Sequence, residues 1–439
     1  MLGTELLMWA LLGGLMASVL AVVPALHIYN VAGFVLLLGD ALSPTLSPER
    51  MAFLFLGMVT GYAMVNTIPS IFLSAPDDST LFIVLPGQKY MMQRRGYEAV
   101  LLSGIGGLGG LAALALLTPV APRLFPALRE ILRPHMGWIL WTIIAYMLLS
   151  EWPKGSDRAS AGLRRWWEGW KSLLAGLLTF LLSGLLGFVL MYRPLVPLGV
   201  GFQNLLPAFV GLFAIPWVIQ NLLSQVALPP QHIARSVDAP LGVIAQGTAS
   251  GVLGGLFAAF FPVVTGGIGG FLAGHATAQR DERMFIISQG ASKVVYYVGG
   301  LLLFFVPGLH LTRGGMAWMI STQYSVYTPD RYYWAMAAVL LTGVLAFGLS
   351  LGLTRLVIAV VARIGYRSLS CATLGILLLI VIGMTGVAGL AICAVATGIG
   401  LLPVLWGSRR MNAMGVLLLP IALNMVGAGA AVAGFLGLL

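Results

Sequence analysis

Apolar runs of about 20 residues recur along nearly the whole chain, and each is long enough to cross roughly 30 Å of hydrocarbon as a helix. Only 9% of the residues are charged and 59% are hydrophobic, whereas soluble domains carry about 25% charged residues. So few charges cannot cover a water-facing surface, which excludes a soluble enzyme. The runs also lack the period-2 alternation of an outer-membrane barrel. The sequence therefore predicts an all-α polytopic membrane protein.

Two of the apolar segments are interrupted by proline, at Pro24 and at Pro262. The two stretches align without a gap, so that Gly13 falls on Gly251 and Pro24 falls on Pro262. We expect about 10–12 membrane segments in all, with these two as proline-broken re-entrant hairpins. The alignment predicts an internal repeat, although any two helices rich in glycine and alanine resemble each other to some degree.

The predicted repeats divide the chain into three parts: residues 1–170 as the first transmembrane repeat, 171–240 as connecting spans and 241–439 as the second transmembrane repeat. The loop 151–171 carries five basic residues, so we place it in the cytoplasm. Counting spans from this loop makes the two repeats antiparallel, as in many secondary transporters.

The net charge of +10 reflects membrane topology. The basic residues are scattered in short loops and form no basic face, so nucleic acid is not an expected partner. The expected partners are the lipid bilayer and a small anionic substrate or a lipid phosphate, and a homodimer is left open. No cofactor and no metal are expected, apart from Na⁺ or H⁺ as a coupling ion. The sequence contains no nucleotide-binding P-loop, which excludes an ATP-driven pump of that class.

The two proline breaks are the first candidate site. Proline removes a backbone donor, and backbone groups freed inside a membrane are tolerated where they line a cavity. Helix N-termini at such breaks attract anions. The alternative is a packing kink between helices, with small residues allowing close approach. The predicted substrate-binding residues are Pro24, His27, Asn30, Pro262, Thr265, Gly266, Gly267 and Lys293.

Lys293 is included because it is the only charged residue inside the apolar segment 284–306. A charge within the membrane is costly and by default is a functional candidate. The alternative is a structural ion pair. Both interpretations predict that a carboxylate contacts Lys293.

The densest polar cluster lies between Asn66 and Lys89, where three prolines and two adjacent carboxylates interrupt an apolar run. The apolar stretch 81–85 within it favours a re-entrant element, and an aqueous loop with solvated aspartates is the alternative. Adjacent carboxylates in such an element can bind a proton or Na⁺. The predicted ion-coupling residues are Asn66, Ser70, Asp77 and Asp78.

These residues carry a resemblance to a known family. The blocks 24–30, 68–78, 85–89 and 95–100 are similar to the archaeal-type branch of the TctA permeases, the large membrane subunits of tripartite tricarboxylate transporters. The resemblance implies a duplicated helical carrier punctuated by glycine and proline. The main branch of that family moves carboxylates with a small membrane subunit and a periplasmic binding protein, driven by an ion gradient. The family has Pro-Gly at both breaks, where this chain has Ala25 and Val263.

The residues and the resemblance together predict a secondary active carrier for an anionic substrate, a carboxylate, in the cell (cytoplasmic) membrane, and not an enzyme. A weaker similarity of 262–267 to polyprenyl-phosphate translocases makes a lipid phosphate translocase the alternative. An intramembrane aspartyl enzyme using Asp77 and Asp78 fits less well, because a catalytic dyad needs carboxylates that converge from separate elements.

Overall fold

The computed structural model describes residues 2–24, 26–42, 46–151, 162–196, 204–223, 228–324 and 328–439. Ala25 and residues 152–161 of the basic loop lie outside these described residues. All regular elements within them are helices, as predicted. The chain is a multi-pass α-helical membrane protein.

Nine helices of the described residues are long and apolar enough to cross a membrane, and a tenth candidate is a helix pair bent by 116°. The segments are Gly3–Leu20, Pro48–Phe72, Gly96–Leu117, Leu163–Tyr192, Leu205–Leu223, Leu241–Phe260, Glu282–Phe305, Pro329–Ile364 and Arg367–Trp406, with Arg410–Met425 and Gly429–Phe435 as the bent pair. Three of the expected segments contain helices shorter than a full span: α2 (Ile28–Leu42) and α13 (Gly266–Ala276), the second arms of the two proline-broken segments, and α8 (Met136–Leu149). At 1.5 Å per residue these fall short of roughly 30 Å.

The chain forms two compact units, Met1–Leu128 with Gln220–Ile376, and Arg129–Ile219 with Leu377–Leu439. Each unit contains chain from both predicted repeats, so the division at 170 and 240 stays a prediction. The helices of the first unit, besides α2 and α13, are α1 (Leu2–Leu20), α3 (Pro48–Val65), α4 (Thr67–Phe72), α5 (Val84–Met92), α6 (Gly96–Leu117), α12 (Leu241–Phe260), α14 (Glu282–Val294), α15 (Gly300–Phe305), α16 (Gly314–Ser321) and α17 (Pro329–Ile364).

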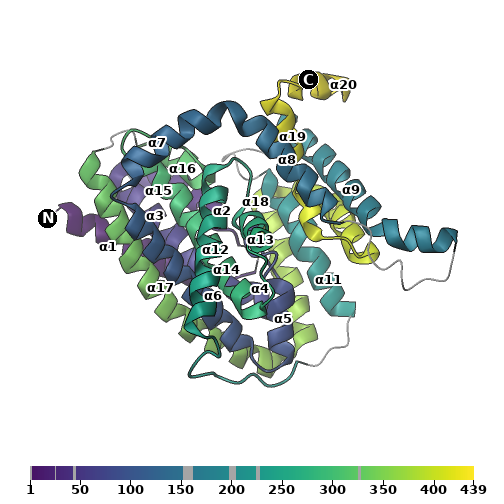
Figure 1. Cartoon of the computed structure of the whole chain (residues 1–439), viewed down its shortest axis with the longest axis horizontal. Helices are drawn as coiled ribbons and strands as arrows, with labels where there is room; N and C mark the ends of the chain where they lie inside the picture. Colours follow the sequence, from purple (N-terminus) through teal and green to yellow (C-terminus); the bar gives the residue numbers. More distant parts are fainter. Residues whose placement is uncertain are drawn as a thin grey trace. The chain divides into compact units, whose positions relative to one another are not determined.

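The helix pairings in the first unit are symmetric. Helix α1 packs against α3, and α17 packs against both of them (Figure 1). Likewise α12 packs against α14, and α6 packs against both. The second set of pairings follows from the first when α1 is replaced by α12, α3 by α14 and α17 by α6. In chain order, α1, α3 and α6 correspond to α12, α14 and α17, and the last helix of each set packs against the first two helices of the other set. An internal duplication would produce this pairing.

Glycines allow these helices to approach closely. A Cβ at Gly57 on α3 would lie 1.8 Å from the carbonyl oxygen of Ala10 on α1. A Cβ at Gly251 on α12 would lie 2.2 Å from the carbonyl oxygen of Ser288 on α14. Van der Waals packing of backbones through small residues is a main source of helix association in membranes, where burial from water contributes little.

The two proline-broken segments fold differently. Helix α12 ends at Phe260, and α13 folds back on it, with a Cβ at Gly254 falling 2.4 Å from the Gly269 carbonyl oxygen. Helix α1 ends at Leu20, but α2 then packs against α3 and α16. The break at Pro262 thus forms a tight hairpin, whereas the segment after Pro24 crosses to other helices.

The second unit is built around α9 (Leu163–Tyr192) and α19 (Gly415–Met425), which meet where a Cβ at Gly187 would lie 1.9 Å from the Val416 carbonyl oxygen. Helix α18 (Tyr366–Trp406) is two helices joined at a kink at Gly386, whose φ of 67° suits glycine. The other helices of this unit are α8, α10 (Leu205–Phe209) and α20 (Gly429–Phe435), and the boundary between the units falls within α7 (Ala121–Leu132), α11 (Ile215–Leu223) and α18.

Candidate functional site

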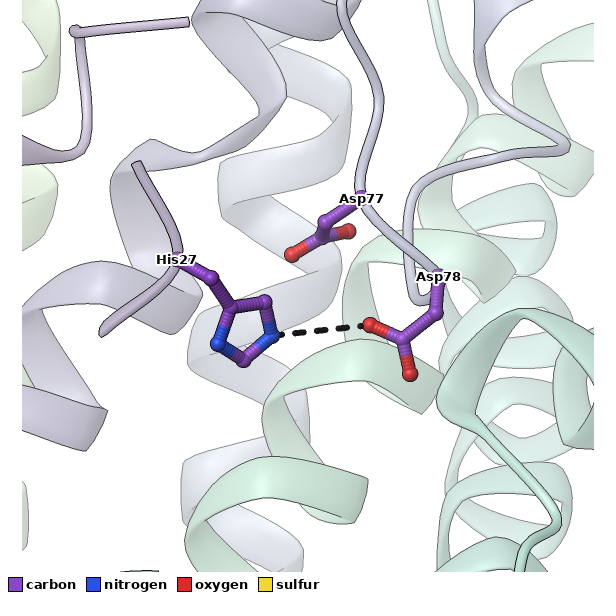
Figure 2. Close-up of side chains that lie close together, drawn as sticks. All are labelled: His27, Asp77 and Asp78. Carbon is purple, nitrogen blue, oxygen red and sulfur yellow. Dashed lines mark ion pairs between the residues drawn. The ribbon is translucent and has the colours of Figure 1, made fainter. Parts of the chain in front are cut away.

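Three segments of the first unit bring polar side chains together inside it. The segment between α1 and α2 supplies His27, the segment from the end of α3 to Thr80 supplies two aspartates, and the π-helix Val295–Gly299 after α14 supplies Tyr297. A π-helix inside a longer helix is rare and frequently lies at a functional site. Figure 2 shows the His27 ring directed toward Asp78, with Asp77 beside them.

The first oxygen of Asp77 organises its own turn. Oδ1 accepts hydrogen bonds from the backbone N–H groups of Ser79 (3.0 Å) and Thr80 (2.9 Å) and from both of their hydroxyl groups (2.8 Å each). An aspartate that bonds the backbone just after itself in this way fixes a turn. This sequence pattern, Asp-Asp-Ser-Thr, therefore folds into a closed loop at the end of the broken α3–α4 segment.

The second oxygen of Asp77 is equally occupied. Oδ2 accepts from Tyr62 Oη at 2.9 Å, from Asn66 Nδ2 at 2.8 Å and from Tyr297 Oη at 3.0 Å. Donors that surround both oxygens stabilise the ionised carboxylate. Asp77 is thus a fully satisfied structural anion.

Asp78 has far fewer partners. Its Oδ1 accepts from Tyr297 Oη at 3.2 Å and lies 3.6 Å from His27 Nε2. Nδ1 of His27 accepts the backbone N–H of Tyr29 at 3.2 Å, so a neutral His27 carries its proton on Nε2. That proton faces Tyr297 Oη, 3.0 Å away, and the Asp78 carboxylate.

Tyr297 connects the cluster, because its single hydroxyl proton lies within reach of both aspartates. When it donates to one of them, the other loses that hydrogen bond. One ligand atom each from His27, Asp77 and Asp78 lies within 4.8 Å of the others, a spacing that can hold a metal ion. The cluster can therefore move a proton or hold a small cation.

Lys293 lies next to this cluster, and it is 1% exposed. Its Nζ donates to Asn66 Oδ1 at 2.8 Å and to the hydroxyl group of Thr67. No carboxylate oxygen of the described residues lies within 4.0 Å of it, so the predicted carboxylate contact is wrong. The Asn66 side chain lies between the two charges instead, because its Nδ2 donates to Asp77.

The turn after Pro262, at the tip of the α12–α13 hairpin, contacts the loop that carries Asp78. Thr265 Oγ1 donates to the Asp78 carbonyl oxygen at 3.1 Å and accepts the N–H of Ile268 at 3.4 Å, which caps α13. A Cβ at Gly266 would lie 2.9 Å from the Lys293 Cα, and one at Gly267 would lie 2.8 Å from the Asp78 carbonyl oxygen. These two glycines are therefore required by close packing.

Arg313 donates hydrogen bonds to backbone carbonyl groups that lose their helical partners at the Pro262 break. Its Nη2 donates to the carbonyl oxygens of Ala258 (3.0 Å) and Val264 (3.1 Å) and also to that of Phe261. Its Nε is buried and has no hydrogen-bond partner in the described part of the chain. Val263 at this turn has φ of 62°, a conformation that is unusual for a β-branched residue and natural for glycine.

Comparison with known proteins identifies the family. The family model of the tripartite tricarboxylate transporter TctA family matches residues 7–415, nearly the whole chain. The chain belongs to the TctA family. An uncharacterized protein of Methanocaldococcus jannaschii is 25% identical over 428 residues, which cover 94% of this chain and 97% of that protein. No solved structure matches the chain.

Membership in this transporter family agrees with the resemblance seen in the sequence blocks 24–30 and 68–100. The Val263 position, where the TctA resemblance led us to expect glycine, keeps a glycine-like backbone conformation. The corresponding residue at the first break, Ala25, lies outside the described residues.

Most of the predicted site residues of this TctA chain meet in one cluster, with Ser70 at its edge, where its hydroxyl bonds Thr80 Oγ1 at 2.8 Å. Pro24 is buried at the turn after α1. Asn30 is buried in the first turn of α2, and no hydrogen bond among the described residues joins its side chain to the cluster.

Sequence reasoning missed Tyr62, Tyr297 and Arg313 as members of the site. Tyr297 stands four residues after Lys293, on the same face of the helix, and this spacing was the available signal. Tyr62 lies one turn before Asn66 on an apolar helix. Arg313 follows α15 in a loop, and nothing in its sequence neighbourhood distinguishes it from an interfacial arginine.

Proposed function

We propose that this protein is a secondary active carrier for a small anionic substrate, a carboxylate, and that an ion gradient across the cytoplasmic membrane drives it. Two observations support the proposal. The family is a transporter family that includes tricarboxylate carriers. A buried cluster of titratable side chains also lies inside the helical unit, where ionisable residues by default mark ion or substrate pathways.

The single observation that carries the coupling proposal is the contrast between the two aspartates. Asp77 has a donor on every side, so binding an ion there would break several hydrogen bonds. Among the described residues, only Tyr297 and His27 have a hydrogen bond or an ion pair with the Asp78 carboxylate. We therefore assign the exchangeable ion to Asp78 and His27, and we assign Asp77 to holding the loop.

Either ion fits this arrangement. A proton arriving at Asp78 would remove its charge and its attraction to His27. A sodium ion would instead take oxygen ligands from the two aspartates, with a ring nitrogen of a neutral His27 within reach. Sodium favours oxygen donors, and the three hydrogen bonds on Asp77 Oδ2 compete with it, so we favour the proton.

For the substrate we propose Arg313 as the counter-charge. Lys293 already donates to Asn66 and Thr67, whereas Arg313 has a buried Nε with no hydrogen-bond partner among the described residues. No carboxylate of the described residues lies within 4.0 Å of its guanidinium group. Arg313 also lies next to the site, since a Cβ at its neighbour Gly314 would fall 3.2 Å from the Tyr29 hydroxyl oxygen. His27 and Thr265, which the sequence also predicts as substrate-binding residues, would lie beside the bound carboxylate.

The test is transport by the purified protein in liposomes. Labelled citrate, succinate and acetate are offered under an imposed pH gradient, an imposed Na⁺ gradient, or neither. The proposal predicts that at least one carboxylate accumulates only when the pH gradient is present. Accumulation driven by Na⁺ alone would overturn the proton assignment.

The same liposomes test the alternative. A lipid phosphate translocase would move a fluorescent polyprenyl phosphate between leaflets and would leave all three carboxylates outside. That outcome would replace the carboxylate proposal. The family match favours the carboxylate, because tricarboxylate is the substrate class in the family's description.

A further inference from the structure

A cavity of about 540 Å³ lies in the first unit, and none of its lining residues belongs to the His27–Asp78 cluster. It is formed by the start of α6, the C-terminal half of α17 and the loop that precedes α12. Leu101 and Leu351 supply an apolar wall, Tyr97 supplies an aromatic one, and the arginines Arg235 and Arg355 supply the charge. The cavity thus combines an apolar wall with two cations.

Both arginine side chains are exposed. No carboxylate oxygen of the described residues lies within 4.0 Å of either guanidinium group. Two other arginines near the cavity are paired: Arg95 with Glu98 at 2.7 Å, and Arg283 with Asp238 at 3.4 Å. Among the described residues, Glu98 and Asp238 therefore pair with Arg95 and Arg283, and the charges of Arg235 and Arg355 stay unmatched.

The Arg355 guanidinium is held over the Tyr97 ring, 5.8 Å from the ring centre. Tyr97 is 2% exposed, so it offers a fixed face for this cation–π contact. Such stacking positions a guanidinium group while leaving its in-plane N–H donors free for an oxyanion.

The cavity lies at the level of the membrane surface. Arg331 near the start of α17 pairs with Glu49 and marks one interface. Arg355 is 24 residues further along the helix, or about 36 Å at 1.5 Å per residue, which exceeds the roughly 30 Å of hydrocarbon. Tyr97 is the second residue of α6, at the end of a membrane-spanning helix. The two arginines are therefore at headgroup depth on the opposite side from Arg331.

We propose that this cavity binds the headgroup of an anionic phospholipid. Arg235 and Arg355 would donate to the phosphate oxygens, because guanidinium groups match phosphate geometry. Leu101 and Leu351 would contact the first carbons of the lipid chains. Basic pockets between membrane helices bind anionic headgroups by this combination. The site is separate from the proposed transport pathway and does not depend on the transport proposal.

The experiment measures lipid binding to the full-length protein by native mass spectrometry from detergent, with phosphatidylglycerol as the probe and phosphatidylcholine as the neutral reference. Tighter binding of phosphatidylglycerol is expected for the wild type. Each Arg→Gln change should weaken it roughly fivefold, so that Arg235→Gln with Arg355→Gln weakens it about 25-fold. Arg235→Lys with Arg355→Lys should retain part of the affinity, because the charges remain.

The matched control is Arg363→Gln with Arg367→Gln, which removes the same charge from exposed positions on the same stretch of chain outside the cavity. Equal weakening in both double variants would show diffuse attraction and would overturn the proposal, as would equal binding of the two lipids by the wild type. Displacement of phosphatidylglycerol by millimolar inorganic phosphate would assign the cavity to a free anion instead. A folded Arg235→Gln/Arg355→Gln protein, verified by its thermal unfolding curve, is required for each comparison.

Discussion

At the scale of single residues, two neighbouring aspartates have separate roles because their surroundings differ. Asp77 accepts hydrogen bonds on both oxygens from residues before and after it in the chain, including Tyr297 far along the sequence. Asp78 faces a histidine whose proton lies on the nitrogen nearest to it. Fixed donors make a carboxylate structural, and sparse, movable donors leave it free to exchange an ion.

The first prediction concerns this difference. Asp77→Asn should lower the stability of the detergent-solubilised protein by about 3 kcal/mol or more, since hydrogen bonds to a buried charge contribute about 1.5–3 kcal/mol each. Asp78→Asn should change stability much less. Thermal unfolding of both variants provides the measurement, and equal destabilisation would contradict the assignment.

The second prediction concerns Tyr297, which links His27 to both aspartates. Tyr297→Phe should slow gradient-driven uptake while leaving the protein folded, because Asp77 Oδ2 keeps its bonds to Tyr62 and Asn66. Tyr296→Phe, one position away, is the matched control and should retain uptake. Similar rates in the two variants would mean that Tyr297 has no part in coupling.

At the scale of helices, the protein depends on close backbone approach at a few glycines. Gly57→Ala should destabilise the protein by about 1–3 kcal/mol, because the new methyl group would overlap the Ala10 carbonyl oxygen and force α1 and α3 apart. Gly348→Ala on α17 meets open space and should be neutral or stabilising. Unfolding curves that shift equally for the two variants would contradict this packing account.

The sequence predicted the membrane helices and the positions of their breaks well. It did not predict the contacts between the helices. The apolar runs gave the membrane helices, and charge inside an apolar segment pointed to Lys293, Asp77 and Asp78. Yet the donors that separate Asp77 from Asp78 come from distant helices, so no local pattern reveals which aspartate is saturated. The carboxylate expected at Lys293 is replaced by Asn66 and Thr67, since neutral oxygens can also satisfy an ammonium group.

At the scale of the whole molecule, α6 packs against α12 and α14, and α17 packs against α1 and α3. This symmetric pairing supports a duplicated chain. Antiparallel repeats predict that the chain following α2 and the chain following α13 lie on opposite sides of the membrane. Single cysteines at Ser47 and Arg280, both exposed, can be tested with an impermeant thiol reagent after Cys371 and Cys393 are replaced by serine. Labelling of both from the same side would establish parallel repeats instead.

The central claim is that Asp78 carries the coupling ion, and it is tested most directly by comparing exchange with accumulation in one variant. For a carboxylate that the wild type accumulates, Asp78→Asn liposomes should exchange labelled for unlabelled substrate yet fail to concentrate it under a pH gradient. Asp238→Asn, a change at a largely exposed carboxylate with a side-chain exposure of 76%, should do both. Normal accumulation by Asp78→Asn would contradict the account.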